Sequence, residues 1–460
     1  TVDAPVPTTA GTSTDTTPPT ETPAQSRPVT ELPGLLDSSD EPIADADGIR
    51  TGVLDNGLTY YVRQNAQPGG HVSLRLAVRA GSADELDEHT GVAHFLEHML
   101  FNGTEKYPEN ELVDVLRGFG AQFGADVNAY TSYDETVYEL SVPNDSATVD
   151  LALDVLDQWL GHATLNDADV VAERGVVLDE WRSSTQTVDG RLYDLAQRHY
   201  LAGTRYEERV PIGTAADIQT MEATTLRAYY DASYRPDNVA VIVVGDIDAD
   251  ATVARIETQF AGATARTDAA PERAPSGITA FAEPGFVLHA DPAQPNVDVE
   301  VTLPLPAFDG HGTAADRAWI LDVVGYDVLI RRLARDAAGG EAPFDDVVSG
   351  SNSFVTGLDA PALYAFTDID RAADTLRALL DEYERAWRFG FDPAEVDVSV
   401  ASLRAQYQTM LAGADDVRDD PRADDLVAHY IDGAPVPDDA AAARRGLAEL
   451  DAVTPEALSE

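Results

Sequence analysis

Two histidines four residues apart are the first candidates for chemistry in this sequence. His94 and His98 end the window His94-Phe95-Leu96-Glu97-His98, and the whole chain has nine histidines in 460 residues. The surrounding run is apolar with helical periodicity, so we expect a helix. Residues four apart on a helix lie one turn above each other on the same face. Both imidazoles could therefore bind one metal ion, and zinc suits two histidines with a carboxylate.

A carboxylate inside the same window could act as a general base. Glu97 follows His94 by three residues and projects to the edge of the same helix face, within reach of a water molecule on the metal. The order H-x-x-E-H is the inverse of the zincin motif H-E-x-x-H. The alternative is a pair of core histidines with a surface glutamate between hydrophobic residues.

A predicted downstream helix offers the third metal ligand. Glu173 and Glu180 are seven residues apart, which places them two turns apart on one face, with Val176 and Val177 between them. Two carboxylates on an inward face need a cation to receive them. Asp179 is a poorer candidate, because it lies about 100° from Glu180 around the helix. The alternative is two surface glutamates.

The composition excludes several classes of function. The chain has 81 acidic and 31 basic residues, for a net charge of −50, which argues against nucleic-acid binding and against binding to anionic lipids. Cysteine is absent, so disulfides and thiolate chemistry cannot contribute. No apolar run reaches the roughly 18 residues that a membrane span needs. We attribute the acid excess to solvation, and a site that attracts cationic substrates is the alternative.

The metal motif is embedded in a predicted set of strands and helices. A hairpin is expected around Asn56-Gly57, and the alternating pattern of residues 72–78 predicts a half-buried strand. The continuous apolar run 239–244 predicts a strand buried on both faces. The remaining elements expected here are a strand at 135–142 and helices at 91–101, 110–119, 148–160 and 166–182.

A second set of elements follows in a similar order. Residues 261–284 are rich in Ala, Pro, Thr and Gly and suit a linker. After it we expect strands at 287–305 and 362–366, and helices at 314–335, 371–388 and 393–411. Both sets alternate strands with helices, which indicates two α/β domains of one type.

The two ends of the sequence give further expectations. Residues 1–48 are rich in Thr and Pro and then acidic, which predicts a disordered linker. The chain begins at Thr1, so we expect an extracytoplasmic location, secreted, surface-tethered or periplasmic; a boundary inside an interdomain linker is the alternative. A helix opens at Thr454-Pro455 with about one turn left, which suggests a longer chain.

Five segments together carry a family resemblance. The chain resembles the M16 (pitrilysin, or insulinase-like) zinc metallopeptidases. Within that family, the sequence of its motifs is similar to that of the large bacterial periplasmic or secreted zinc proteases. The similar segments are residues 56–62, 79–82, 91–104, 173–182 and 234–238. The resemblance is most specific over residues 50–250 and weaker beyond 285.

The resemblance implies an α+β fold made of two homologous M16-type domains. Each would be a mostly antiparallel sheet packed with helices, and the pair would form half of a clamshell. We place the catalytic domain at 49–260, the linker at 261–284 and a second, non-catalytic domain at 285–460 that is truncated at its end.

The resemblance also assigns roles to individual residues. It implies that His94, His98 and Glu180 bind one Zn²⁺ per chain, that Glu97 is the general base, and that Glu173 is a further catalytic-site carboxylate supporting the ligands.

A substrate-binding set is implied in the same way. Asn128 and Ala129 would lie on an edge strand that pairs with an extended peptide, and we add Phe101 to this set. The alternative for residues 128 and 129 is an ordinary edge strand.

The function implied is that of a zinc-dependent endopeptidase acting on peptides or small unfolded proteins. Its partners would be the peptide substrate and a second M16 half, either a continuation of the chain or a partner subunit. Two alternatives stay open: a non-catalytic subunit that binds or presents peptides, and a zinc-dependent amidase.

Overall fold

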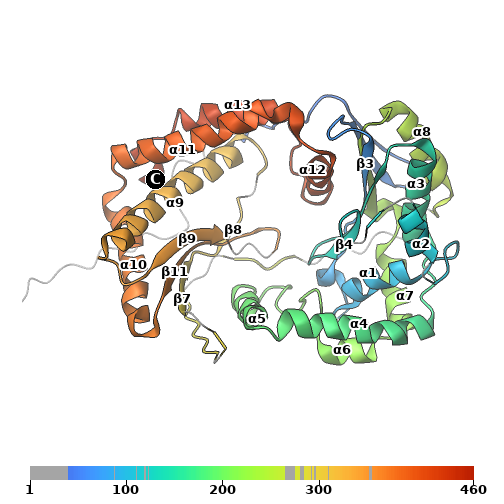
Figure 1. The fold of residues 1–460 in the computed structure, drawn as a ribbon, viewed down its shortest axis with the longest axis horizontal. Coiled ribbons are helices and arrows are strands. Elements are labelled where there is room, and N and C mark those ends of the chain that lie inside the picture. The colour runs from blue at the N-terminus through green and yellow to red at the C-terminus, as the bar shows by residue number, and fades with distance from the viewer. Residues whose placement is uncertain are drawn as a thin grey trace, which may run out of the picture.

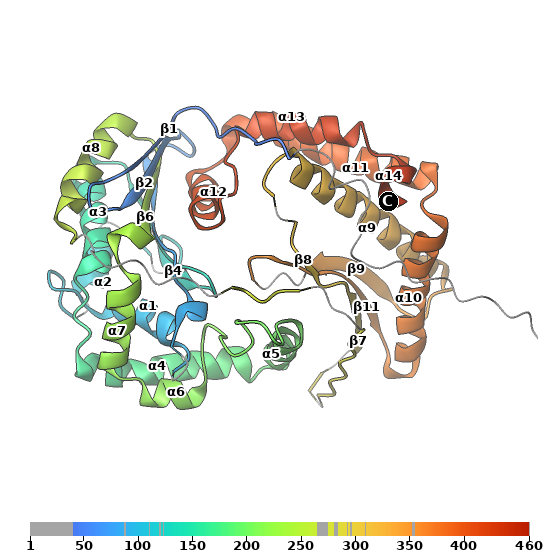
Figure 2. The ribbon, with the colours of Figure 1, turned by 180° about the vertical axis from the view of Figure 1, so that it is seen from behind.

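The computed structural model describes most of the chain after the N-terminal segment. The described residues are 40–86, 89–109, 111–118, 121–122, 124–264, 275–279, 284–291, 293–294, 297–308, 310–351 and 355–459. The predicted N-terminal linker and much of the predicted linker 261–284 lie outside these residues. Figure 1 and Figure 2 show two groups of elements side by side, each with a sheet and its covering helices.

The first sheet has six strands in the order β1-β2-β6-β3-β5-β4. All neighbouring strands are antiparallel except β2 and β6, which are parallel. The hairpin predicted around Asn56-Gly57 is confirmed as β1 and β2. The strands are β1 (Ile49–Val53), β2 (Thr59–Gln64), β3 (His71–Val78), β4 (Val127–Thr131), β5 (Thr136–Pro143) and β6 (Val239–Gly245).

Helices from the same part of the chain cover one face of this sheet. They share a core with the sheet that contains Leu74, Leu76, Phe95 and Trp159, all without measurable exposure. The helices of this part are α1 (Val92–Asn102), α2 (Glu111–Gly118), α3 (Ser146–Gly161), α4 (Asp167–Thr185), α5 (Val188–Tyr200), α6 (Ala215–Thr220), α7 (Ala223–Ser233) and α8 (Ala249–Gln259).

The other face of the sheet is covered by a helix from the far end of the chain. Helix α12 (Asp419–Asp432) packs there, and its Leu426 and Val427 join a second core with residues of β3, β5 and β6. The prediction that residues 72–78 are half-buried is therefore wrong. Both faces of β3 are buried, because a helix more than 300 residues later in the chain covers the face that carries Ser73 and Arg75.

A buried arginine explains how polar residues are accommodated under α12. Arg75 is 3% exposed, and its Nη2 lies 3.2 Å from Oδ1 of Asp424 and 3.5 Å from Oδ1 of Asp420. Its Nε lies 3.5 Å from Oε1 of Glu139 on the neighbouring strand. A buried cation needs such partners, because leaving it unpaired costs several kcal/mol. The contacts of Arg75 therefore favour the docked position of α12.

The second group contains a smaller antiparallel sheet in the order β7-β11-β9 and a separate pair, β8 with β10. Strand content between 287 and 305 is less than predicted, since residues 284–291 form no strand. The strands are β7 (Val297–Thr302), β8 (Leu305–Pro306), β9 (Asp346–Ser351), β10 (Leu358–Asp359) and β11 (Pro361–Thr367).

Long helices pack on this sheet and on one another. No helix is predicted between residues 412 and 453, where α12 and α13 lie. The helices are α9 (Thr313–Gly339), α10 (Ala372–Phe389), α11 (Pro393–Ala412), α13 (Asp439–Leu450) and α14 (Pro455–Ser459). Within the described residues, no helix combines the length and apolarity needed to cross a membrane.

Truncating the apolar contact of α12 should destabilise the protein. Leu426 is 1% exposed, so Leu426→Ala should lower the free energy of unfolding by about 2–5 kcal/mol, as cavity-forming substitutions do. Chemical denaturation measures this change. Leu380→Ala is the matched control, because Leu380 on α10 is 49% exposed and its truncation should cost less than about 1 kcal/mol. Equal losses for both variants would contradict the docking of α12.

Candidate metal centre

The first turn of α1 is held by a carboxylate from the preceding loop. The N-cap is Gly91, whose φ of 78° and close approach to the carbonyl oxygen of Ile212 (2.8 Å from a built Cβ) both favour glycine. Glycine offers no capping side chain. Glu85 supplies the missing acceptor, since its two oxygens accept hydrogen bonds from the backbone N–H groups of Gly91 (3.0 Å) and Ala93 (2.8 Å). His94 follows directly in this turn.

Helix α4 lies beside α1 and presents the carboxylates. Val177 is fully buried and helps to fix the helix against the core, whereas Val176 is 54% exposed. The expectation that both valines face inward is therefore wrong for Val176, because adjacent helical residues point about 100° apart. Glu173 and Glu180 nevertheless both reach the face of α1 that carries the histidines.

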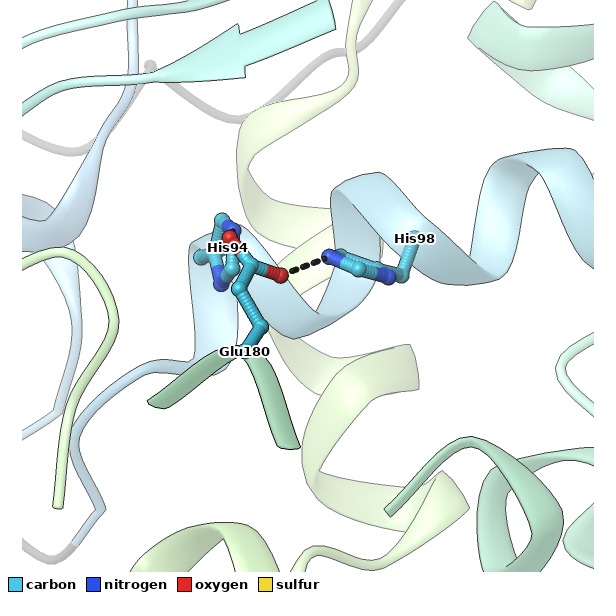
Figure 3. Close-up of side chains that lie close together, drawn as sticks. All are labelled: His94, His98 and Glu180. Atoms are coloured by element: carbon cyan, nitrogen blue, oxygen red, sulfur yellow. Dashed lines mark ion pairs between the residues drawn. The ribbon is translucent and has the colours of Figure 1, made fainter. Parts of the chain in front are cut away.

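Three predicted metal ligands converge at this contact. Oε1 of Glu180 lies 3.5 Å from Nε2 of His94, and its Oε2 lies 3.1 Å from Nε2 of His98. One ligand atom from each residue lies within 4.8 Å of the other two. Figure 3 shows the carboxylate of Glu180 reaching from α4 to the two rings on α1. Among the described residues, no other group of three His, Cys, Asp or Glu side chains meets this criterion.

This donor set fits a zinc ion. Zinc accepts imidazole nitrogen and carboxylate oxygen at roughly 2.0–2.2 Å in tetrahedral geometry, so its ligand atoms lie about 3–4 Å apart. The separations from Glu180 to the two histidines fall in that range. Three protein ligands leave one tetrahedral position for water or substrate, which is the pattern of catalytic rather than structural zinc.

The ionisation of the cluster also suits a cation. Hydrogen bonds from His94 and His98 hold the pKa of Glu180 well below its usual range. Burial by itself would lower the pKa of His98, but the carboxylates of Glu173 and Glu180 outweigh it and raise this pKa to about 10. Without metal, the positive charge that the carboxylates require is therefore a proton on His98. A divalent cation bound here displaces that proton.

Glu173 contacts the ring nitrogen of His98 that Glu180 does not contact. Its Oε1 lies 3.0 Å from Nδ1 of His98, and its Oε2 accepts a hydrogen bond from Nδ2 of Asn102 at 2.6 Å. A carboxylate can only accept, so Nδ1 of His98 carries the hydrogen and Nε2 is directed at Glu180. A partner of this kind fixes the tautomer and the ring orientation of a metal-binding histidine.

Glu97 lies beside the triad and is held by the edge strand. It is 8% exposed, and Oγ1 of Thr131 on β4 donates a hydrogen bond to its Oε2 at 2.7 Å. Burial raises the pKa of Glu97. Sequence reasoning missed Thr131. The alternation along β4 carried a signal, because it places this polar residue on the same face as the core residues Val127 and Ala129.

The predicted substrate-binding residues fall in two places. Asn128 and Ala129 lie on β4, which ends the sheet, with Asn128 exposed and Ala129 packed against the core. Phe101 packs its ring against Trp159 (centroids 5.2 Å apart) and Tyr138 (6.1 Å). These contacts give Phe101 a packing role, and the substrate-binding role of all three residues stays a prediction.

Comparison with protein families matches two models to this chain. Residues 60–210 match the model described as insulinase (peptidase family M16), and residues 220–403 match the peptidase M16 inactive domain. The predicted fold class, two M16-type α+β domains, is confirmed. The domain boundaries stay a prediction.

Individual relatives agree with these matches. The probable zinc protease PqqL of Haemophilus influenzae is 42% identical over 201 residues, which cover 44% of this chain but 22% of that protein. The solved first half of the periplasmic protease PqqL from Escherichia coli has a TM-score of 0.83 and 27% identity, over 91% of this chain and 89% of that one. The solved protease itself has a TM-score of 0.84 and 27% identity, over 92% of this chain but 46% of that chain. The chain thus spans less than half the length of these two full-length PqqL proteins.

The buried carboxyl of Glu85 should make stability depend on pH. Burial raises the pKa of Glu85 from its ordinary 4.5 to about 8, against the opposing hydrogen bonds from Ala93 and Gly91. Between pH 4.5 and about pH 8, Glu85 therefore keeps a proton in the folded protein that it loses in the unfolded chain. Its contribution to stability is full below pH 4.5 and is lost as the pH rises to about 8, at a rate on the order of 1 kcal/mol per pH unit.

Glu85→Gln tests this, because glutamine has no proton to lose. In zinc-free protein, thermal unfolding of the wild type and of the variant is compared between pH 5 and pH 8. The wild type should lose stability more steeply than the variant. Parallel curves would contradict a proton held at Glu85.

Proposed function

Because this chain belongs to the M16 peptidase family, we propose that it provides the catalytic half of a zinc-dependent endopeptidase. The observation that carries the proposal is the convergence of His94, His98 and Glu180 within 4.8 Å, beside the buried carboxylate of Glu97. A donor set with one open position, next to a buried base, suits hydrolysis of an amide bond.

The residues of the chain divide the chemistry between them. His94, His98 and Glu180 would hold the zinc ion. When bound, zinc would polarise the scissile carbonyl and lower the pKa of a water molecule to about 7. Glu97 takes the proton of the attacking water and delivers it to the departing amine. Burial prepares Glu97 for this role, because it raises the proton affinity of the carboxylate. Thr131 holds the carboxylate in place.

The edge strand β4 supports the assignment of a peptide substrate. Its outer side pairs with no other strand of the described sheet, so an extended peptide could add there by main-chain hydrogen bonds. Asn128 and Ala129 would lie opposite the peptide. This mode of binding accepts many sequences, which suits peptides or small unfolded proteins as substrates.

The relatives suggest the setting in which the chain acts. One PqqL relative is named a probable zinc protease and another a periplasmic protease, and the chain matches about one half of the solved protease. We infer an extracytoplasmic location and a second M16 half, in the same polypeptide or in a partner subunit, that completes the substrate chamber. A non-catalytic peptide-binding subunit is the weaker alternative, because the residues of the metal site and the base are all present.

Replacing the general base should separate metal binding from catalysis. Glu97→Gln should leave zinc bound, because Glu97 is not a ligand, and should reduce cleavage of a quenched fluorescent peptide on the order of 10²–10⁴-fold. Glu257→Gln on α8 is the control, because this glutamate is exposed and lies outside the site. Full activity in Glu97→Gln would eliminate Glu97 as the base.

The isolated 460 residues should bind metal but cleave slowly. We expect one zinc per chain by elemental analysis, and loss of that zinc in His94→Ala, which removes a ligand.

Cleavage by the isolated chain should be weak, because the opposing half is absent. Rapid turnover by a chain that light scattering shows to be monomeric would contradict the need for a second half.

A further inference from the structure

The contact between α1 and α4 extends one residue beyond the H-x-x-E-H motif. His94, His98 and Asn102 follow one another at four-residue intervals and so share a face of α1. Two carboxylates of α4 face them in a staggered arrangement. Glu180 contacts His94 and His98, and Glu173 contacts His98 and Asn102. Asn102 thus ends a series whose other members are the two histidine ligands.

We propose that Asn102 is a positioning residue of the zinc site, which acts on His98 through Glu173. The proposal rests on the zinc-binding part of the proposed function and is independent of the substrate. In it, the amide of Asn102 fixes one oxygen of Glu173, so that the other oxygen stays directed at Nδ1 of His98. No role was assigned to Asn102 by the motif or by the resemblance to the family.

The hydrogen bonds of Glu173 give the first argument. A carboxylate with a single partner can still turn about its terminal torsion, which is broad. Glu173 has two partners, at 3.0 Å on one oxygen and 2.6 Å on the other, and both come from the same rigid helix. Its side chain is only 13% exposed, so water has little access to replace a lost bond. The two bonds therefore set the carboxylate in one orientation.

The neutral charge of Asn102 gives the second argument. An amide donates a hydrogen bond without cancelling the charge of the carboxylate, whereas a lysine or arginine would. Glu173 therefore keeps its negative charge for His98, where it strengthens the ligand nitrogen that faces the metal.

The two histidines differ in the partner of Nδ1, so the proposed support from Glu173 and Asn102 acts on His98 alone. Nδ1 of His98 has Glu173 as a partner, while Nδ1 of His94 is buried without a hydrogen-bond partner in the described part of the chain. The orientation of His94 depends on the capped first turn of α1. The orientation of His98 depends on Glu173 and, through it, on Asn102.

Zinc affinity in a double-mutant cycle tests the proposal without any peptidase assay. The dissociation constant is measured by competition with a chromophoric chelator in the wild type, Asn102→Ala, Glu173→Ala and the double variant. Loss of a partner behind a metal ligand typically weakens binding 10–100-fold, and we expect about tenfold for Asn102→Ala. In the Glu173→Ala background the same substitution should change the constant by less than about twofold.

Further variants separate positioning from general destabilisation. Asn144→Ala is the matched control, because this amide also bonds a carboxylate, that of Asp246, away from the site. It should leave zinc affinity unchanged. Asn102→Asp keeps the shape but repels Glu173, and should weaken zinc at least as much as the alanine. Circular dichroism and the melting temperature of the zinc-free variants verify that each is folded.

Two results would overturn the proposal: unchanged zinc affinity in Asn102→Ala, or equal weakening with and without Glu173. Zinc binding with the expected coupling but no peptide cleavage, even with the second M16 half present, would refute the endopeptidase assignment and leave the role of Asn102 intact. A wild-type chain that binds no zinc would refute both.

Discussion

The placement of two glutamates of α4 against two histidines of α1 is the constraint on which the site depends. Partly buried carboxylates and imidazoles at 3.0–3.5 Å are unfavourable unless their charges balance. A shared divalent cation would provide that balance, and a proton on His98 offsets one of the two negative charges when no metal is bound. The rest of the local fold supports this contact. The core face of α1, the buried Val177 and the cap from Glu85 all fix one helix relative to the other.

The first sheet depends on a segment from the opposite end of the sequence. Helix α12 closes the face that carries Ser73 and Arg75, and it brings the carboxylates that pair with Arg75. The edge strand proposed to bind substrate, β4, belongs to this same sheet. A segment near the far end of the chain therefore contributes to the stability of the first sheet through α12.

Local pattern predicted which candidate ligands would converge better than it predicted the packing around them. The two histidines and Glu97 were found from a spacing of three and four residues, and Glu180 from a second helix with its own seven-residue spacing. These relations lie within single helices, where sequence distance fixes geometry. The family resemblance supplied the pairing of the two helices, which spacing alone could not.

The contacts that the sequence did not predict join segments far apart in the chain. The alternation of residues 72–78 is typical of a half-exposed strand, and no local signal announces a covering helix at 419–432. Thr131, Asn102 and Glu85 act through one or two hydrogen bonds to other elements. Their positions are compatible with many surroundings, so only the assembled structure identifies their partners.

The hydrogen bond from Thr131 to Glu97 joins the strand proposed to bind the peptide to the proposed general base. Strand β4 would pair with the substrate and also orients Glu97. A bound peptide would therefore have a fixed position relative to the base. Sliding a strand by one residue advances it by about 3.4 Å and exchanges the side chains on its two faces. Under the proposed function, a peptide shifted by one residue along β4 would therefore present the opposite set of side chains to the inner face, and the choice of peptide bond would depend on which set fits there.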